Sequence, residues 1–257
     1  MLKDSFFFSI ITVAYNSQNT IRDTILSILN QEFNNIEYII IDGGSSDLTV
    51  DIAEGFRVDF EKVGIKYVIV SERDKGIYDA MNKGIKLANG DWIGIINSDD
   101  YYSLQCLKHV YEAISGMPNS ELVYGNMTVL DDNGVEVFYR PRKPVKDIVN
   151  CLTIFHPTVF VSRQVYQRYG KFNSEFKLVG DWEFLKRIYL RGVRFHYVNN
   201  VLATFRKGGA GSGFKMTHLS ESMRVRHSYL RWDFIWYDLK DWLVYLYYLF
   251  FPNRSLF

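Results

Sequence analysis

The 257-residue sequence is poor in cysteine and has no apolar run long enough to cross a bilayer. Its two cysteines, Cys106 and Cys151, lie far apart without the spacing of metal ligands. We therefore expect buried thiols in a reducing compartment, and neither a disulfide nor a zinc site. Residues 6–13 are too short an apolar run for a secretory or spanning segment and lack a cleavage site. Residues 242–252, the longest uncharged stretch near the C-terminus, are also too short to span a bilayer.

The sequence also lacks two nucleotide-binding signatures and any internal repeat. No G-x-G-x-x-G follows the first predicted strand, which excludes the Rossmann dinucleotide fingerprint, and the absence of G-x-x-x-x-G-K-[ST] excludes a P-loop. The net charge is only +1, but residues 1–139 hold 10 Lys/Arg and 21 Asp/Glu (−11), whereas residues 140–257 hold 20 and 8 (+12). This asymmetry predicts either separate partners for the two halves or two faces that attract each other within one fold.

Strands and helices alternate along the first half of the chain. A hydrophobic content of 47% and an aromatic content of 16% exclude a disordered chain, and the length allows one large or two small domains. Short connections between alternating elements imply right-handed crossovers and a mostly parallel sheet. The first helix begins at a capping box formed by Thr20 and Asp23. The predicted strands are residues 6–13, 38–41, 67–70, 92–96, 122–124, 127–130, 135–139 (after a hairpin turn at 131–134), 158–161, 195–198 and 202–205, and the predicted helices are residues 20–29, 47–56, 77–88, 103–115 and 181–192, before a helical tail.

The central strand, residues 92–96, is an apolar run typical of a strand buried on both faces. It ends in Asn97, Ser98, Asp99 and Asp100. Two adjacent carboxylates at the end of a buried strand repel each other and need a cation or hydrogen-bond donors. Because ligands of open α/β sheets bind at the carboxyl ends of strands, we expect the active centre and a hard divalent cation here. The alternative is that Asp99 and Asp100 begin the next helix.

Four strand ends carry polar or aromatic residues that would meet at one edge of a parallel sheet. A nucleotide suits this set, because Tyr15 can pack against a base, Asp42 can accept hydrogen bonds and Gly43 permits close backbone approach. A metal at the end of the central strand would neutralise a diphosphate. Arg73 and Lys75 would either hold phosphates or lie in a solvated loop.

The chain resembles glycosyltransferase family 2, most closely the branch that builds bacterial surface polysaccharides, in four blocks: residues 12–16, 40–47, 71–84 and 97–100. The resemblance implies an inverting, metal-dependent hexosyltransferase that uses a UDP-sugar and Mn²⁺ or Mg²⁺. It implies the α/β GT-A fold, a Rossmann-like, mostly parallel sheet flanked by helices, with a C-terminal helical extension. The implied nucleotide-binding residues are Val13, Tyr15, Asp42, Gly43, Asp74, Lys75 and Asp99, and the implied metal ligands are Asp99 and Asp100.

The resemblance covers about residues 6–210 and also implies a division of the chain. Residues 1–215 would form the GT-A domain, with a nucleotide-sugar-binding half at 1–125 and an acceptor half at 126–215. Residues 216–257 would form the extension. Two positions depart from the family pattern. Gly43 stands where the family often has a second Asp that contacts the base, and Asn97 stands at the first position of the Asp-x-Asp metal motif.

The resemblance also places a catalytic base before a helix, in the region of residues 172–187. Asp181 takes that position and Glu183 is the second choice, whereas the alternative role for Asp181 is a helix N-cap. Inversion needs a base on the acceptor side, opposite the leaving diphosphate, so Asp181 would take the proton of the acceptor hydroxyl. His156 is either an acceptor contact or structural. Residues 208–213 form either a lid over the donor or a surface loop.

The tail, residues 234–251, is rich in Trp, Tyr and Phe. Such side chains favour the membrane interface, so we expect peripheral attachment, which places the enzyme on the cytoplasmic face of the membrane. The resemblance implies a sugar acceptor on a polyprenyl diphosphate in O-antigen, capsule or exopolysaccharide synthesis. The alternatives for the tail are a helix packed on the domain and a helix in a homodimer.

Two other functions are compatible with the sheet and its carboxylates. One is a nucleotide-binding or scaffold protein without catalysis, against which intact Asp99, Asp100 and Asp181 argue. The other is a nucleotidyltransferase, which would normally carry a Gly-rich, basic loop after the first strand, where residues 16–20 show none. We expect no nucleic-acid partner.

Overall fold

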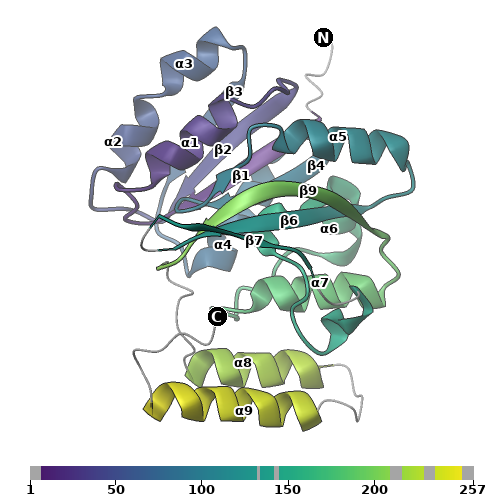
Figure 1. Ribbon diagram of the computed structural model, residues 1–257. Coiled ribbons are helices and arrows are strands. Elements are labelled where there is room, and N and C mark those ends of the chain that lie inside the picture. Colours follow the sequence, from purple (N-terminus) through teal and green to yellow (C-terminus); the bar gives the residue numbers. More distant parts are fainter. Residues whose placement is uncertain (1–6, 132–133, 142–144, 209–215, 229–234, 251–257) are drawn as a thin grey trace.

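The computed structural model describes residues 7–131, 134–141, 145–208, 216–228 and 235–250. In this part of the chain the strands form one curled, nine-stranded sheet with helices on both faces (Figure 1). The predicted α/β class is therefore confirmed. The strands are β1 (Phe8–Ala14), β2 (Ile36–Asp42), β3 (Lys66–Ser71), β4 (Trp92–Asn97), β5 (Tyr101–Tyr102), β6 (Leu122–Leu130), β7 (Glu136–Tyr139), β8 (Phe160–Ser162) and β9 (Phe195–Arg206).

The strand order is β3-β2-β1-β4-β8-β6-β9-β5, with β7 beside β6. The first four of these are parallel to one another, and Phe8 of β1 lies opposite Ile36 of β2 and Trp92 of β4. Strands β5, β7 and β8 run antiparallel to their neighbours, whereas β6 and β9 are parallel to each other. The sheet is thus parallel where the first half of the chain builds it and mixed where the second half does.

Helices cover both faces of this sheet (Figure 1). They are α1 (Ile21–Leu29), α2 (Thr49–Glu54), α3 (Arg57–Lys62), α4 (Ile77–Leu87), α5 (Cys106–Gly116), α6 (Arg163–Tyr169), α7 (Gly180–Leu190), α8 (Met216–His227) and α9 (Ile235–Phe250), with short 3-10 helices η1 (Val145–Val149) and η2 (His156–Thr158). Successive residues of a strand point to opposite faces. Ile11 therefore belongs to a core that includes residues of α4, α6, α7 and α8, whereas Ile10 belongs to a second core that includes residues of α1, α2, α3 and α5. Burial on both faces explains the continuous apolar runs of the central strands.

Two of the local predictions about helix starts are wrong. The Thr20 side chain makes no capping hydrogen bond, and Asp23 forms an ion pair with Arg206 of β9 instead. Asp99 and Asp100 do not begin a helix, because β5 follows them and α5 starts only at Cys106.

Two pairs of predicted strands are single strands. Residues 122–124 and 127–130 both belong to β6, and residues 195–198 and 202–205 both belong to β9. The pairing of β6 with β9 changes register on either side of Asn126, so an irregular segment joins two regular ones. The hairpin prediction is confirmed, since β6 and β7 pair antiparallel; residues 132–133 of its turn lie outside the described residues.

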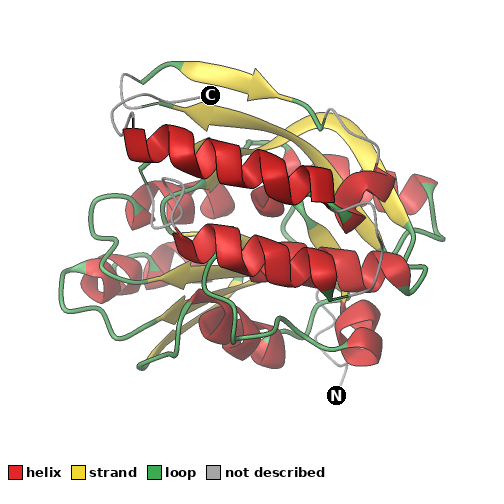
Figure 2. Cartoon of the chain, turned by 90° about the horizontal axis from the view of Figure 1, so that it is seen from below, coloured by secondary structure: helices red, strands yellow, loops and turns green. Residues whose placement is uncertain are grey.

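The C-terminal helices α8 and α9 lie side by side along one end of the molecule (Figures 1 and 2). Val225 of α8 belongs to the core shared with α4, α6 and α7. Arg226 of α8 is buried and forms ion pairs with Asp238 (2.5 Å) and Asp241 of α9. Among the described helices, none has both the length and the apolar character needed to cross a membrane.

Candidate active site

The carboxyl ends of β1, β2, β3 and β4 lie side by side, and we call this part of the sheet the carboxyl edge. Strand register places Val13 opposite Asn97, and Asp42 opposite both Ala14 and Ser71. Val13 is buried just beneath this edge. The residues that follow the four strand ends are therefore brought together, as the sequence predicts.

Asp42 is buried at the carboxyl edge and holds the turn that follows β2. Its carboxylate accepts hydrogen bonds from the N–H groups of Gly44 (3.0 Å) and Ser45 (2.9 Å) and from the hydroxyls of Ser45 (2.5 Å) and Ser71 (2.7 Å). The Ser45 hydroxyl in turn accepts a bond from the N–H of Asn16 (2.8 Å). Asp42 thus shapes the backbone that surrounds Tyr15 and Gly43.

Tyr15, Gly43 and Asp74 meet at this turn. Tyr15 is 64% exposed. A Cβ placed on Gly43 would lie 2.5 Å from Asp74 Oδ2 and 3.4 Å from the Tyr15 ring, so the carboxylate occupies the space that a side chain here would need. Asp74 Oδ1 is held by the N–H of Gly76 (2.9 Å). An exposed ring beside a carboxylate oxygen can stack on a nucleobase and accept one of its N–H groups.

Asp99 and Asp100 lie at the end of β4, where Asp100 is fully buried and Asp99 partly buried. Burial raises the pKa of both carboxyls, and the charge of Asp99 raises the pKa of Asp100 further. Asp100 accepts hydrogen bonds from the N–H of Arg206 (3.0 Å) and from Asn97 Nδ2 (3.4 Å). Asn97 Oδ1 is buried and has no hydrogen-bond partner among the described residues. Carboxylate and amide oxygens in this state fit a hard divalent cation, which prefers oxygen ligands.

The loop after β3, residues 72–76, is here called the donor loop. Lys75 and Arg73 have exposed side chains. Both backbone groups of Lys75 are hydrogen-bonded: its N–H donates to Asp79 Oδ2 (3.0 Å), and its carbonyl accepts a bond from Lys177 Nζ (2.8 Å). The donor loop therefore has a restrained backbone and two cationic side chains in solvent.

Asp181 lies in the first turn of α7 and faces α4. Tyr78, in the first turn of α4, donates a hydrogen bond from its hydroxyl to Asp181 Oδ1 (3.2 Å). Val179 occupies the cap position of α7, which has no side-chain cap of its own, so the N-cap alternative for Asp181 is wrong. Burial lowers the pKa of His156, and the charge of the nearby Asp181 opposes that shift. Tyr78 and Asp181 thus join the first turns of α4 and α7, and His156 lies near enough to feel the charge of Asp181.

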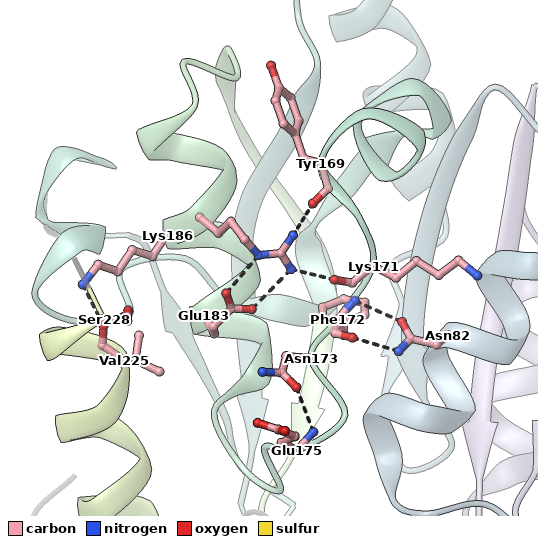
Figure 3. Close-up of polar contacts among 11 residues, drawn as sticks. Asn82, Tyr169, Lys171, Phe172, Asn173, Glu175, Glu183, Lys186, Val225 and Ser228 are labelled. Carbon is pink, nitrogen blue, oxygen red and sulfur yellow. Dashed lines mark hydrogen bonds and ion pairs between the residues drawn. The ribbon is translucent and has the colours of Figure 1, made fainter.

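Glu183, the second candidate for the base, is buried and paired with Arg187 at 2.9 Å (Figure 3). Arg187 also donates to the carbonyls of Tyr169 and Lys171. These bonds join α7 to the segment that follows α6, and they occupy the Glu183 carboxylate. Asp181 Oδ2, in contrast, accepts no hydrogen bond from a described residue.

Comparison with known proteins identifies the family. The sequence model described as "Glycosyl transferase family 2" matches residues 9–173, which is more than half of the chain. The chain belongs to glycosyltransferase family 2. A "PGL/p-HBAD biosynthesis glycosyltransferase" of Mycobacterium tuberculosis is 29% identical over 204 residues, covering 79% of this chain and 77% of that protein. The "Putative glycosyltransferase EpsH" of Bacillus subtilis is 36% identical over 93 residues, covering 36% of this chain and 26% of that protein.

Solved structures of glycosyltransferases share the fold. Staphylococcus aureus TarS 1–349 in complex with UDP-GlcNAc has a TM-score of 0.69 at 21% identity; the match covers 85% of this chain and 65% of that chain. The mannosyltransferase PcManGT of Pyrobaculum calidifontis, in complex with GDP-Man and Mn²⁺, has a TM-score of 0.64 at 17% identity over 98% of this chain and 77% of that chain. The expected GT-A fold is confirmed by these likenesses.

Two residues that bond to the predicted site carboxylates have no role in the sequence pattern. Tyr78 lies within the third family block, yet its contact with Asp181 spans 103 residues and has no local signature. Arg206 reaches Asp100 through its backbone N–H and Asp23 through its guanidinium, so it joins β9 to the segment that follows β4 and to α1. From residue 209 onward, the glycine-rich segment predicted as a lid or loop lies outside the described residues.

Proposed function

We propose that this protein is an inverting hexosyltransferase that transfers a sugar from a UDP-sugar to a hydroxyl of a sugar acceptor in bacterial surface-polysaccharide synthesis. The observation that carries the proposal is the geometry of the carboxyl edge, where an exposed aromatic ring lies beside Asp74. The same edge carries the carboxylates that follow β4, which pairs in parallel with β1. Family membership supports the reaction class, and TarS bound to UDP-GlcNAc supports the nucleotide. Residues 1–125 would bind the donor, residues 126–215 the acceptor, and residues 216–257 would form the C-terminal extension.

The donor nucleotide would bind across β1, β2 and the donor loop. In this arrangement Tyr15 stacks on the base and Asp74 Oδ2 accepts its N–H group, while Gly43 leaves room for both. Val13 and Asp42 form the floor of this subsite, and Asp42 acts through the turn that it holds. The exposed ammonium of Lys75 is placed to meet the phosphates. Asp99, at the end of β4, would lie against the ribose and diphosphate.

The residues at the end of β4 fit Mn²⁺ or Mg²⁺, with Asp99, Asp100 and the unpaired oxygen of Asn97 as ligands. Among the described residues no group of three or more His, Cys, Asp or Glu is placed to hold an ion, so the donor's diphosphate would complete the coordination, as is usual for Mg²⁺. The bound cation would neutralise the charge that develops on the leaving diphosphate. The Mn²⁺ in the PcManGT structure supports this assignment.

Asp181 would act as the general base. Its Oδ2 takes the proton of the acceptor hydroxyl while the acceptor oxygen forms a bond to the anomeric carbon and the bond from that carbon to the diphosphate breaks. Tyr78 holds Oδ1 and so directs Oδ2 toward the acceptor. Attack from the side opposite the leaving group inverts the anomeric configuration. His156, beside this carboxylate, would contact the acceptor.

The acceptor would be carried on a polyprenyl diphosphate at the cytoplasmic face of the membrane. Four apolar side chains on one side of α9, here called the apolar stripe, are exposed: Leu239 (49%), Trp242 (41%), Leu243 (59%) and Leu246 (41%). Their spacing places them on a single helical face. Because residues 140–257 carry a net charge of +12, an anionic membrane surface is the partner that we propose for this stripe.

A donor screen tests the proposal. Purified protein is incubated with a panel of UDP-, GDP- and TDP-sugars and Mn²⁺, and release of the nucleoside diphosphate is measured with and without EDTA. We expect metal-dependent release from a UDP-sugar. The absence of both transfer and hydrolysis across the whole panel would refute the proposed function.

A further inference from the structure

The three residues that precede α7, residues 177–179, are held by a side chain from α8, and we call them the base loop because they lead to Asp181. Glu221 is buried in the middle of α8. Its Oε1 accepts the N–H of Lys177 (2.7 Å), and its Oε2 accepts the N–H groups of Leu178 (2.9 Å) and Val179 (3.2 Å). One carboxylate thus satisfies three consecutive backbone donors next to the positive end of the α7 dipole.

The base loop is also attached to the donor loop. Lys177 donates from Nζ to the carbonyl of Lys75 (2.8 Å) while its own N–H is held by Glu221. Two residues beyond the base loop, Asp181 is bonded to Tyr78, which follows the donor loop in the chain. The segment that carries Asp181 is therefore held both by the donor loop and α4, through Lys75 and Tyr78, and by Glu221 of α8.

Glu221 is itself firmly placed, because α8 is bonded to α7 at a second point. Lys186 of α7 is buried and donates from Nζ to the carbonyls of Val225 (2.7 Å) and Arg226 (3.0 Å) (Figure 3 shows the first of these). The Arg226 guanidinium lies 5.4 Å from the centre of the Trp182 ring and donates to the carbonyl of Asn150 (2.9 Å). Helix α8, bonded to α7 and to the carbonyl of Asn150, is thus the support from which Glu221 reaches the base loop.

We propose that Glu221 is a positioning residue for the catalytic base, which makes α8 part of the active centre. The inference rests on the proposed role of Asp181 as the base. A carboxylate that binds three N–H groups is replaced poorly by an amide, because glutamine offers one acceptor oxygen and no charge. The family match ends at residue 173, so neither Glu221 nor Asp181 lies within it.

The test compares Glu221→Gln with a matched control, Glu175→Gln. Glu175 also joins this region to α8, through an ion pair with Arg224 at 2.5 Å, but that carboxylate is 68% exposed and does not bond the base loop. Steady-state kcat, donor KM and donor Kd are measured for both variants, together with amide hydrogen exchange of the peptide that contains residues 177–179. Melting temperatures confirm that each variant is folded.

We expect Glu221→Gln to lower kcat about 10- to 100-fold, the scale of small displacements of a catalytic group, with donor Kd unchanged and exchange in the base loop increased. Glu175→Gln should match the wild type in all of these. Glu221→Asp, which keeps the charge with a shorter reach, should recover part of kcat, and it replaces the Gln variant if that variant is unfolded. Wild-type kcat in Glu221→Gln, alongside an inactive Asp181→Asn, would overturn this inference and leave the proposed function standing. Wild-type kcat in Asp181→Asn would overturn the base assignment and the inference with it.

Discussion

Replacing Tyr78 by Phe removes one hydroxyl from the site and leaves the buried ring in place. That hydroxyl donates to Asp181 Oδ1 at 3.2 Å. Burial and the charge of Asp181 raise the pKa of Tyr78 well above its usual value, so the hydroxyl remains a donor throughout the assay range. A hydrogen bond to a charged group contributes about 1.5–3 kcal/mol. Because 3.2 Å is at the long end for such a bond, we expect its loss to cost the lower figure in unfolding free energy. The hydroxyl affects turnover by holding the carboxylate in position, and for a small misplacement of the base we expect a roughly 10-fold fall in kcat.

Tyr38→Phe is the matched control for this experiment. Tyr38 is also fully buried, and its hydroxyl donates to Thr12 Oγ1 at 2.9 Å, within the core. Each variant loses one buried hydrogen bond, which costs about 1 to 1.5 kcal/mol of unfolding free energy and lowers the melting temperature by a few degrees. Only Tyr78→Phe should lose kcat, measured as nucleoside diphosphate release at saturating donor and acceptor. Equal kcat values for the two variants would refute the positioning role of the Tyr78 hydroxyl.

Three further predictions concern the metal, the subsite for the nucleobase and the membrane. Burial and the charge of Asp99 hold the pKa of Asp100 above the ordinary 3.8. Without metal, the folded protein therefore loses stability as the pH rises from 3.8 through the raised pKa of this carboxyl. Asp100→Asn should therefore raise the metal-free melting temperature at pH 7 while abolishing metal-dependent donor binding. A lower melting temperature or intact binding would contradict this. Gly43→Ala would place its Cβ 2.5 Å from Asp74 Oδ2, so the KM for the donor should rise about 10-fold while kcat is unchanged. An unchanged KM would count against the proposed nucleobase subsite at Tyr15 and Asp74. Leu243→Asp should weaken sedimentation with anionic liposomes whereas Val58→Asp, at an equally exposed site, should not; loss of self-association instead would assign the stripe to a homodimer.

The parallel half of the sheet can be predicted from sequence because its strands are buried on both faces. Such strands read as uninterrupted apolar runs, and the first polar residue after each run marks the strand end. The apolar runs therefore predict Tyr15, Gly43 and Asp99 at the carboxyl edge, and the register of β1 with its two neighbours aligns these strand ends. The long strands β6 and β9 are each predicted as two strands, because their apolar runs are interrupted at Gly125 and at Asn199 and Asn200, which lie within the strands.

The support for the base could not be predicted, because it consists of contacts between distant parts of the chain. Tyr78 and Asp181 are 103 residues apart, and Glu221 and Lys177 are 44 residues apart. Neither pair leaves a periodic or motif signal, since Tyr78, Asp181 and Glu221 also fit an ordinary helix and Lys177 fits an ordinary loop. The tail illustrates the same limit: its helices were predicted, but the attachment of α8 to α7 through Lys186 depends on packing that local pattern does not record.

The most direct test of an inverting transfer at this site is the turnover of Asp181→Asn. This change keeps the shape of the side chain and removes its ability to take a proton. Donor Kd is measured by calorimetry, and nucleoside diphosphate release is followed at saturating donor and acceptor with Mn²⁺. The predicted result is an unchanged donor Kd with turnover lowered by roughly 10²-fold or more, the usual scale for loss of a general base. Turnover near that of the wild type would contradict the assignment of Asp181 and move the base elsewhere.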